Sequence, residues 1–316
     1  MSEEKKEGKK EENILDDPKH GILIPSCLVL VGVIILYAQS RSGKILLALP
    51  ILFTFLSVNY LKAKSRKQSV YKDKWTKLEL VDQTIISKNS AIYRFNLKTR
   101  LEALNTPVGH HLAVRFNIDG NDQIRYYTPI SPQYETGHFD IIVKSYPDGT
   151  VSKCFAGLKP GDQVEFQGPV GRFNYVPNSY KEICMIAGGS GITPMLQVIS
   201  KIVSTPEDFS KMTLIFANET ENDILLKDEL DEIAEKYPNL KIHYVLNNPT
   251  TGKSIGDVGL VTKELMSKYL PNPSPDVRLL ICGKPDMKKM LLEYSEELGW
   301  PSGTLKSNPD DQVFCF

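Results

Sequence analysis

The sequence predicts an antiparallel β-barrel followed by an α/β doubly wound parallel sheet, with a transmembrane hairpin in front of both. Three observations predict this architecture. Short β-branched runs separated by turn signals fill residues 75–176, buried-strand runs alternate with helical patterns from residue 182 onward, and two uncharged apolar runs precede residue 62. A chain of 316 residues is long enough for two domains at roughly 100–200 residues per domain.

The composition argues against several classes of protein. Lys plus Arg and Asp plus Glu both number 38, so the formal net charge is zero and no nucleic-acid partner is expected. The five cysteines are widely spaced and form no CxxC or Cys/His cluster, so the sequence predicts neither a disulfide framework nor a metal site. No pattern indicates an oligomeric state.

Residues 21–62 are expected to form a membrane-spanning hairpin that contacts the lipid bilayer through residues 21–61. They contain two uncharged apolar runs, 21–38 and 45–61, whose lengths match the lower limit for a membrane-spanning helix. Basic residues between 62 and 67 flank the second run, and basic flanks favour the cytoplasmic side. The large C-terminal part is therefore expected in the cytosol.

Two other interpretations of this region stay open. Pro25, Pro50 and the short lengths are compatible with a single span plus one interfacial helix, and a buried soluble helical hairpin is the second alternative. A cleaved signal peptide is disfavoured, because residues 1–20 form a long charged lead, predicted to be a disordered tail, and no A-x-A exit follows the first run. Residues 63–72 are expected to be a basic linker.

Residues 73–177 are predicted to form the barrel domain. Five short strands are separated by turn signals such as Pro147-Asp148-Gly149 and Lys159-Pro160-Gly161-Asp162. Strands at this spacing are typical of a small antiparallel barrel or sandwich. The expected strands are Trp75–Val81, Ala91–Leu97, His111–Phe116, Phe139–Val143 and Gln163–Gln167.

Residues 178–316 are predicted to form the parallel sheet. Four apolar runs are each followed by a helical pattern, which gives a βαβαβαβα order typical of a doubly wound fold. The strands are expected at Ile183–Ala187, Met212–Ala217, Lys241–Leu246 and Arg278–Cys282, and the helices at Pro194–Val203, Leu225–Lys236, Thr262–Tyr269 and Met287–Leu298. Ligands of such sheets bind outside the carboxyl ends of the strands.

The turn Gly188-Gly189-Ser190-Gly191 follows the first of these strands and opens a helix. Glycines allow backbone N–H groups to approach a phosphate closely, and the positive N-terminus of the helix favours an anion. Glycines at a strand–helix junction are also often only tight-turn chemistry. The position after the first strand of the α/β half is what favours nucleotide binding.

Four further segments carry candidate ligand groups. In Arg125–Ser131 a guanidinium suits a phosphate, a tyrosine suits an aromatic ring and a threonine suits a ring nitrogen, although an exposed β edge has the same composition. Residues 144–152, KSYPDGTVS, offer a lysine and hydroxyls but also match a hairpin turn. The segment 168–175 is a Gly/Pro-rich exit from the barrel or a linker. Residues 281–285 end the last strand, where a lone Cys282 is more often a small buried hydrophobe.

In this order, the segments resemble the NADH–cytochrome b5 reductases, within the wider ferredoxin–NADP reductase-like flavoproteins. The matching motifs are RxYTPxS, a GPxGxxxY-like segment, MIAGGSGITPMLQVI, FANETENDILLKDEL, ICG and the terminal VFCF. The resemblance covers residues 73–316. The hydrophobic hairpin in front of it is most similar to a fungal membrane-bound branch of the family.

The resemblance implies FAD and NADH as cofactors and a role for each motif. Arg125 would neutralise the FAD pyrophosphate, Tyr127 would pack on the isoalloxazine, and Thr128 would reach the region of its N5. The glycine turn would bind the pyridine nucleotide, and Cys282 would lie by the nicotinamide, so Thr128 and Cys282 are the expected catalytic residues. The expected cofactor-binding residues are Arg125, Tyr127, Thr128, Ser131, Val143, Lys144, Tyr146, Gly149, Val151, Ser152, Gly188, Gly189, Ser190, Gly191, Thr193, Cys282 and Gly283.

Three positions depart from the family pattern. Tyr126 replaces the proline that commonly follows the arginine of the flavin motif, and Lys284 replaces the first proline of CGPP. Asn247-Asn248 stand where NADH-preferring members often carry an aspartate after the third strand of the α/β half. An acidic group there would hydrogen-bond the ribose 2′-hydroxyl and repel a 2′-phosphate. The preference for NADH over NADPH is therefore implied by the resemblance alone.

The implied activity is hydride transfer from NADH to FAD, followed by release of single electrons to an acceptor. Cytochrome b5 is the leading acceptor by resemblance and a membrane quinone is the second. The endoplasmic reticulum is the leading membrane, ahead of the plasma membrane and the mitochondrial outer membrane. Two rival hypotheses are a membrane trafficking or scaffold protein with an idle reductase fold, and a soluble-type reductase whose leading segment is cleaved.

Overall fold

The computed structural model describes residues 24–40, 50, 53, 54, 57, 58, 69–146, 148–250 and 255–316. The chain divides into two units, 1–68 and 69–316. In the first unit, helix α1 (Ile24–Ser40) overlaps the first predicted apolar run. Among the described residues, no helix is both long and apolar enough to cross a membrane. The predicted tail, most of the second apolar run and most of the predicted linker lie outside the described residues.

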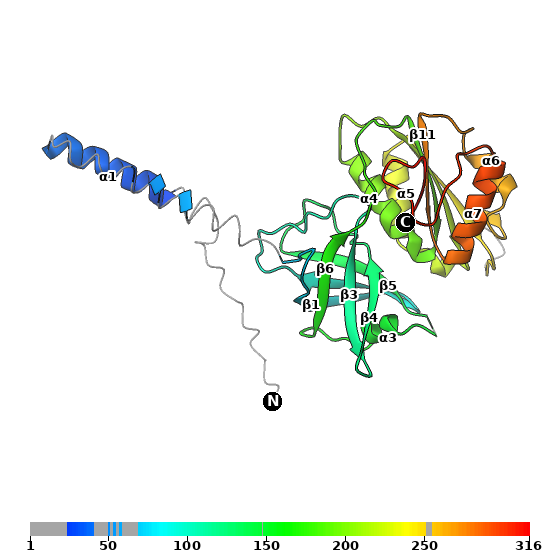
Figure 1. The fold of residues 1–316 in the computed structure, drawn as a ribbon, viewed down its shortest axis with the longest axis horizontal. Helices are drawn as coiled ribbons and strands as arrows, with labels where there is room; N and C mark the ends of the chain where they lie inside the picture. The colour runs from blue at the N-terminus through cyan, green and yellow to red at the C-terminus, as the bar shows by residue number, and fades with distance from the viewer. Residues whose placement is uncertain are drawn as a thin grey trace. The chain divides into compact units, whose positions relative to one another are not determined.

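The second unit begins with a six-stranded antiparallel sheet, here called the barrel half, in the order β4-β3-β6-β1-β2-β5 (Figure 1). All five predicted strands are present. A sixth strand covers the first part of the Arg125–Ser131 motif and lies at the edge of the sheet, as an exposed β edge would. The strands are β1 (Thr76–Ser87), β2 (Ser90–Asn96), β3 (His111–Ile118), β4 (Asn121–Tyr127), β5 (His138–Lys144) and β6 (Gln163–Val170).

Aromatic side chains fill the core of the barrel half. Phe95, Phe139 and Phe166 are fully buried and pack against one another with ring centroids 4.7–5.8 Å apart. Phe95 and Phe166 come from strands that alternate buried and more exposed residues, the pattern of a sheet with one face on a core, whereas Phe139 comes from β5, which buries five consecutive residues. The short helix α3 (Val151–Ala156) lies between β5 and β6 and contributes Phe155 to this core. The predicted hairpin turn at 144–152 is therefore a loop that leads into a helix.

The rest of the second unit is a parallel sheet, here called the parallel half, in the order β10-β9-β8-β7-β11-β12. All four predicted strands and all four predicted helices are present, and two short edge strands were not predicted. The strands are β7 (Glu182–Gly188), β8 (Lys211–Asn218), β9 (Leu240–Leu246), β10 (Asp257–Val258), β11 (Val277–Cys282) and β12 (Val313–Cys315). The helices are α4 (Ile192–Val203), α5 (Lys227–Lys236), α6 (Lys263–Tyr269) and α7 (Pro285–Glu297).

Helices cover both faces of this sheet (Figure 1). The central strands β7, β8 and β11 bury five consecutive residues each, because a parallel sheet with helices on both sides has no solvated face. Helices α4 and α5 pack on one face through residues such as Met195 and Leu230. Helices α6 and α7 pack on the other face through residues such as Met266 and Leu291.

One apolar cluster joins the barrel half and the parallel half. The cluster under α4 also contains Val108, Ile142 and Phe173, which come from the barrel half and the segment that leaves it. The connection itself runs from the end of β6 to the start of β7, in the region where the sequence predicts the boundary. Because apolar residues of both halves pack together, the carboxyl edge of the parallel sheet is held beside the barrel.

Candidate functional site

The Arg125–Ser131 motif ends the edge strand β4. Arg125 and Tyr127 lie on one face of the strand and Tyr126 on the other, because successive side chains of a strand alternate. The Arg125 guanidinium is exposed, and its Nη1 donates to the backbone oxygen of Ile124 at 2.8 Å. Its other N–H groups have no hydrogen-bond partner among the described residues, so a phosphate could accept two of them.

Tyr127 and Tyr126 have different surroundings. Tyr127 packs edge-on against Phe155 of α3, with ring centroids 5.1 Å apart, and burial raises the pKa of its phenol. Tyr126 is 60% exposed and meets the ring of His111 edge-on at 4.9 Å. Burial, with the neighbouring His110, lowers the pKa of His111 to about 4, so its imidazole is neutral at pH 7. The side chain that replaces the family's proline therefore faces solvent.

The loop before α3 brings Gly149 and Ser152 together. The Oγ of Ser152 is buried and has no hydrogen-bond partner among the described residues. A Cβ at Gly149 would collide with that oxygen, so a larger residue there would displace the Ser152 hydroxyl. Val143 and Val151 were predicted to bind the cofactor, but both side chains are buried in the barrel core. A cofactor would therefore meet the backbone groups of these two residues more readily than their side chains.

Lys144, at the end of β5, reaches across to the parallel half. Its Nζ donates to Oδ1 of Asp223 at 2.8 Å, and the two side chains are 10% and 21% exposed. Burial alone would raise the pKa of Asp223, but the hydrogen bonds from Lys144 and Thr220 hold it below its usual value. The lysine predicted to complete the flavin site is thus already engaged in an ion pair that joins the two halves.

The glycine turn lies where the sequence places it, between β7 and α4. Residues Gly189–Gly191 form one turn of 3₁₀ helix, and Gly189 has a φ of +52°, a conformation that favours glycine. A Cβ at Gly191 would collide with the backbone oxygen of Cys282. A Cβ at Gly188 would come within 2.5 Å of the Met287 sulfur. The turn therefore packs directly on the end of β11 and the start of α7.

Cys282 ends β11 and pairs in register with Ala187 of β7, so the structure brings it beside the glycine turn. Burial raises the pKa of its thiol to about 12, with Lys288 acting in the opposite direction. The thiol is therefore protonated at pH 7 and is not a nucleophile. Gly283 follows it against the Met287 sulfur, and Lys284 places its Nζ 5.9 Å from the Tyr146 ring centre.

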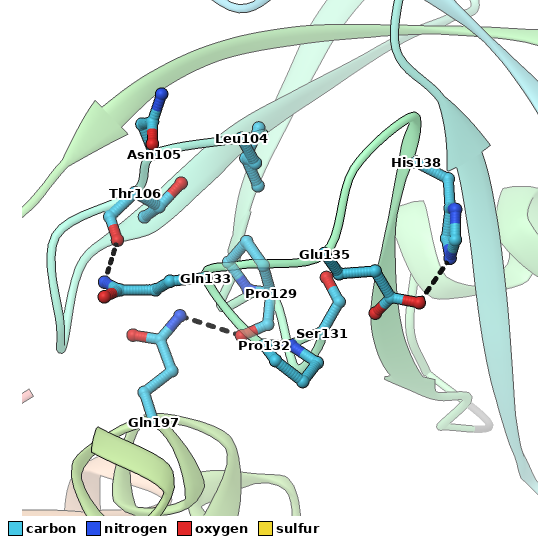
Figure 2. A pocket seen from close by; sticks show the side chains of 10 residues that line it. All are labelled: Leu104, Asn105, Thr106, Pro129, Ser131, Pro132, Gln133, Glu135, His138 and Gln197. Carbon is cyan, nitrogen blue, oxygen red and sulfur yellow. Dashed lines mark hydrogen bonds and ion pairs between the residues drawn. The ribbon is translucent and has the colours of Figure 1, made fainter. Parts of the chain in front are cut away.

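The predicted site residues of the barrel half and those of the parallel half meet where the two halves join. Strand β5 contacts the Gly189–Gly191 turn. Gln197 of α4 donates from Nε2 to the Pro129 oxygen at 2.8 Å (Figure 2). It also accepts from the Gly109 N–H at 2.7 Å. The cavity that Figure 2 shows, lined by barrel-half residues and Gln197, has a volume of only about 10 Å³, which is too small for an organic ligand.

The remaining predicted residues occupy the same two regions. Ser131 accepts from the Asp140 N–H at 3.2 Å and thereby holds the end of the motif to β5. Thr193, in the first turn of α4, is buried and donates to the Ser190 oxygen at 3.2 Å. Asp223, Gln197 and Met287 were not identified as site residues from the sequence. The first two lie inside the motifs FANETENDILLKDEL and MIAGGSGITPMLQVI, which were the only signal available.

Two buried polar side chains test whether the residues suit the expected cofactors. Ser152 Oγ, near the exposed Arg125 strand, and the amide of Asn218, at the end of β8, have no hydrogen-bond partners in the part of the chain that the structure describes. Buried polar groups are normally hydrogen-bonded, so each suits a polar ligand group. One lies in the barrel half and one at the carboxyl edge of the parallel half. The residues therefore fit FAD in the first half and a dinucleotide at the second.

Two family models match the chain. One is described as an oxidoreductase FAD-binding domain and matches residues 77–175, and the other as an oxidoreductase NAD-binding domain and matches residues 185–293. The first covers the motif around Arg125, and the second covers the glycine turn and Cys282.

Several known proteins are similar to this chain. The plasma membrane-associated coenzyme Q6 reductase PGA3 of Saccharomyces cerevisiae is 56% identical over 316 residues, all of both chains. NADH-cytochrome b5 reductase 1 of Candida albicans is 42% identical over 84% of this chain and 91% of its own. The crystal structure of the cytochrome b5 reductase domain of Ulva prolifera nitrate reductase matches with a TM-score of 0.72 and 32% identity, over 79% of this chain and all of that one.

Proposed function

The chain belongs to the NADH–cytochrome b5 reductase family, and we propose from this premise that it delivers electrons to cytochrome b5 at a membrane. It is an FAD-dependent oxidoreductase driven by NADH. Bound FAD supplies the redox chemistry, because it accepts a hydride from NADH and releases electrons singly. The observation that carries the proposal is the contact between β5 and the Gly189–Gly191 turn, which brings the two predicted cofactor sites together.

The protein's own groups bind and orient the two cofactors in this proposal. Arg125 would bind the FAD pyrophosphate with its remaining donors, and Ser152 with the backbone at Val151 would add hydrogen bonds to the same cofactor. Tyr127 and Thr128 would fix the flavin ring. The N–H groups of Gly189–Gly191 and the N-terminus of α4 would bind the dinucleotide pyrophosphate. Such orientation accelerates hydride transfer, because the reacting atoms are already aligned before the reaction.

Cys282 is proposed to position the nicotinamide as a neutral neighbour. We expect Cys282→Ala to slow flavin reduction by NADH about tenfold, with FAD content unchanged, because a packing contact on one side of the ring is lost. The check is the rate of flavin bleaching in anaerobic stopped flow. A reduction rate equal to that of the unaltered protein would remove this role from Cys282. Cys154→Ala, a cysteine in the barrel half, is the matched control.

A membrane quinone is the second candidate acceptor. The relative that is 56% identical over all of both chains carries the name of a coenzyme Q6 reductase, and this similarity extends through the N-terminal region. A flavin held near a bilayer is within reach of a quinone headgroup. The same relative is described as plasma membrane-associated, which supports the plasma membrane beside the endoplasmic reticulum as the compartment.

We propose that residues 21–61 anchor the protein in the bilayer with the catalytic part in the cytosol. The two uncharged runs and the basic residues after them support this arrangement. The proposed domain boundaries are 73–177 for FAD and 178–316 for the nucleotide; the family matches at 77–175 and 185–293 fall inside them and support the proposal. Alkaline carbonate extraction of membranes tests the anchor: the proposal expects the protein to remain in the pellet.

The acceptor is tested by comparing turnover with the two candidates. The purified full-length protein is supplied with NADH and either cytochrome b5 or a short-chain ubiquinone under the same conditions. The proposal predicts that cytochrome b5 is reduced at least tenfold more efficiently, judged by kcat/KM. The opposite order would assign the quinone as acceptor, and reduction of neither would contradict both candidates.

A further inference from the structure

The carboxyl edge of the parallel sheet carries one acidic side chain held in an unusual place. Glu219 follows the end of β8 and is exposed. Its Oε2 accepts from the Nδ2 of Asn247 at 3.1 Å and from the Nδ2 of Asn248 at 3.0 Å, both at the end of β9. A backbone hydrogen bond also joins the ends of β8 and β9, since the Asn248 N–H donates to the backbone oxygen of Glu219 at 2.7 Å. The two asparagine amides therefore restrain the Glu219 carboxylate, which would otherwise rotate freely in solvent.

Sheet order determines which part of a dinucleotide would lie there. The proposed nicotinamide position is at Cys282 on β11 and the proposed pyrophosphate position is at the turn after β7. In the order β9-β8-β7-β11, a dinucleotide that runs from β11 across β7 continues over the ends of β8 and β9. The adenosine half would therefore lie over Asn218, Glu219 and Asn247.

A second observation at this edge points to a ligand. Asn218, the last residue of β8, is 8% exposed, and neither atom of its side-chain amide has a hydrogen-bond partner among the described residues. It precedes Glu219 directly, and β8 contacts the Gly189–Gly191 turn. A buried amide with both donor and acceptor unused suits the hydroxyl groups of a ribose, which donate and accept hydrogen bonds.

We propose that Glu219 is the residue by which this enzyme selects NADH over NADPH. Its carboxylate supplies, from the end of β8, an acidic group beside the proposed ribose position, where the end of β9 carries the uncharged Asn247. The two asparagine amides orient the carboxylate toward the ribose. It accepts a hydrogen bond from a 2′-hydroxyl and repels a 2′-phosphate, which carries negative charge. This inference rests on the proposed function, since it uses the proposed course of the dinucleotide.

The variant Glu219→Gln isolates the charge. Glutamine has the same shape and its Oε1 can still accept from both asparagine amides, so the loop keeps its hydrogen bonds while the negative charge is removed. We expect kcat/KM for NADPH to rise about tenfold and kcat/KM for NADH to fall two- to threefold. Adding Asn247→Asp to this variant restores an acidic group at the same edge and should restore the preference for NADH. Glu232→Gln, an exposed carboxylate on α5, is the matched control and should change neither value.

Binding of two nucleotide probes gives a readout that does not depend on flavin. Adenosine 5′-monophosphate and adenosine 2′,5′-bisphosphate differ only in the 2′-phosphate, and calorimetry measures the affinity of the protein for each. The unaltered protein should prefer the monophosphate, and Glu219→Gln should reduce or reverse that preference. Raising the salt concentration should weaken the discrimination of the unaltered protein but not that of the variant, because exposed charges are screened.

The proposal would be overturned by an unaltered protein that does not prefer NADH. It would also be overturned if the ratio of kcat/KM for NADH to kcat/KM for NADPH in Glu219→Gln stayed within twofold of the ratio in the unaltered protein. The proposal would also be overturned if Glu219→Gln lost the preference for NADH and the added Asn247→Asp substitution did not bring that preference back. Failure of the proposed function looks different: the unaltered protein would not reduce its flavin with either nucleotide. The two probes would still report whether a 2′-phosphate is rejected at Glu219.

Discussion

Arg125→Ala is expected to leave the purified protein nearly free of FAD. The guanidinium lies exposed on the edge strand β4 and has donors left over after its bond to Ile124. A hydrogen bond between a charged donor and a phosphate contributes about 1.5–3 kcal/mol, so the loss of even one should weaken FAD binding about 10- to 100-fold. The affinity for a nucleotide at the glycine turn should change little, because the arginine belongs to the barrel half.

The ratio of flavin absorbance to protein absorbance after dialysis measures this effect. Arg115→Ala is the matched control, since Arg115 lies on the neighbouring strand β3 with its guanidinium paired to Glu165 and Asp122 at 2.8 and 3.0 Å. Arg125→Lys keeps the charge but not the planar fork and should retain an intermediate amount of FAD. An Arg125→Ala protein with the FAD content of the unaltered protein would show that the pyrophosphate is bound elsewhere.

Gly191→Ala is expected to reduce the rate of flavin reduction by NADH about 100-fold. The new Cβ would lie 2.7 Å from the backbone carbon of Cys282 and collide with the oxygen bonded to it. Backbone atoms at the end of a buried strand cannot move aside, so the turn itself must shift away from β11. A misplacement of about 1 Å between reacting groups costs about 100-fold in rate. The overpacking should also lower the stability of the protein by about 1–3 kcal/mol.

Anaerobic stopped flow and thermal unfolding, measured on the same preparation, separate the two effects of Gly191→Ala. The FAD content should remain normal, because the substitution lies in the parallel half. Gly157→Ala controls for the change of residue type, since the nearest atom to its Cβ would be the Cys154 oxygen at 3.6 Å, an ordinary contact. Unchanged reduction kinetics at every NADH concentration would show that the close approach of Gly191 to Cys282 has no part in positioning the nucleotide.

Local patterns in the sequence predict most of the fold. The alternation in Gln163–Gln167 and the apolar runs such as Ile183–Ala187 correspond to strands β6 and β7, because side-chain periodicity is a local property. Helix α3 was missed because six residues after a Pro-Asp-Gly turn carry too short a pattern. Strand β12 was missed because its three residues are held by pairing with β11 rather than by a pattern of their own.

The candidate site could be predicted only in part. Motif residues such as Arg125 and Gly191 could be named, since glycine turns and arginine motifs are short and local. The contacts that join the halves could not, because Lys144 and Asp223 are 79 residues apart in sequence. The burial of Val143 and Val151 depends on which side of the strand and of α3 faces the barrel core. Glu219 was passed over for a related reason, since its asparagine partners are 28 and 29 residues further along the chain.

The most direct test of the account is the visible spectrum of the purified full-length protein before and after NADH is added without oxygen. The account predicts a flavin spectrum that bleaches on addition of NADH, which would establish the bound cofactor, the electron donor and competence for hydride transfer together. A colourless protein that cannot be reconstituted with FAD, or a bound flavin that NADH does not bleach, would contradict it and favour a scaffold with an idle reductase fold.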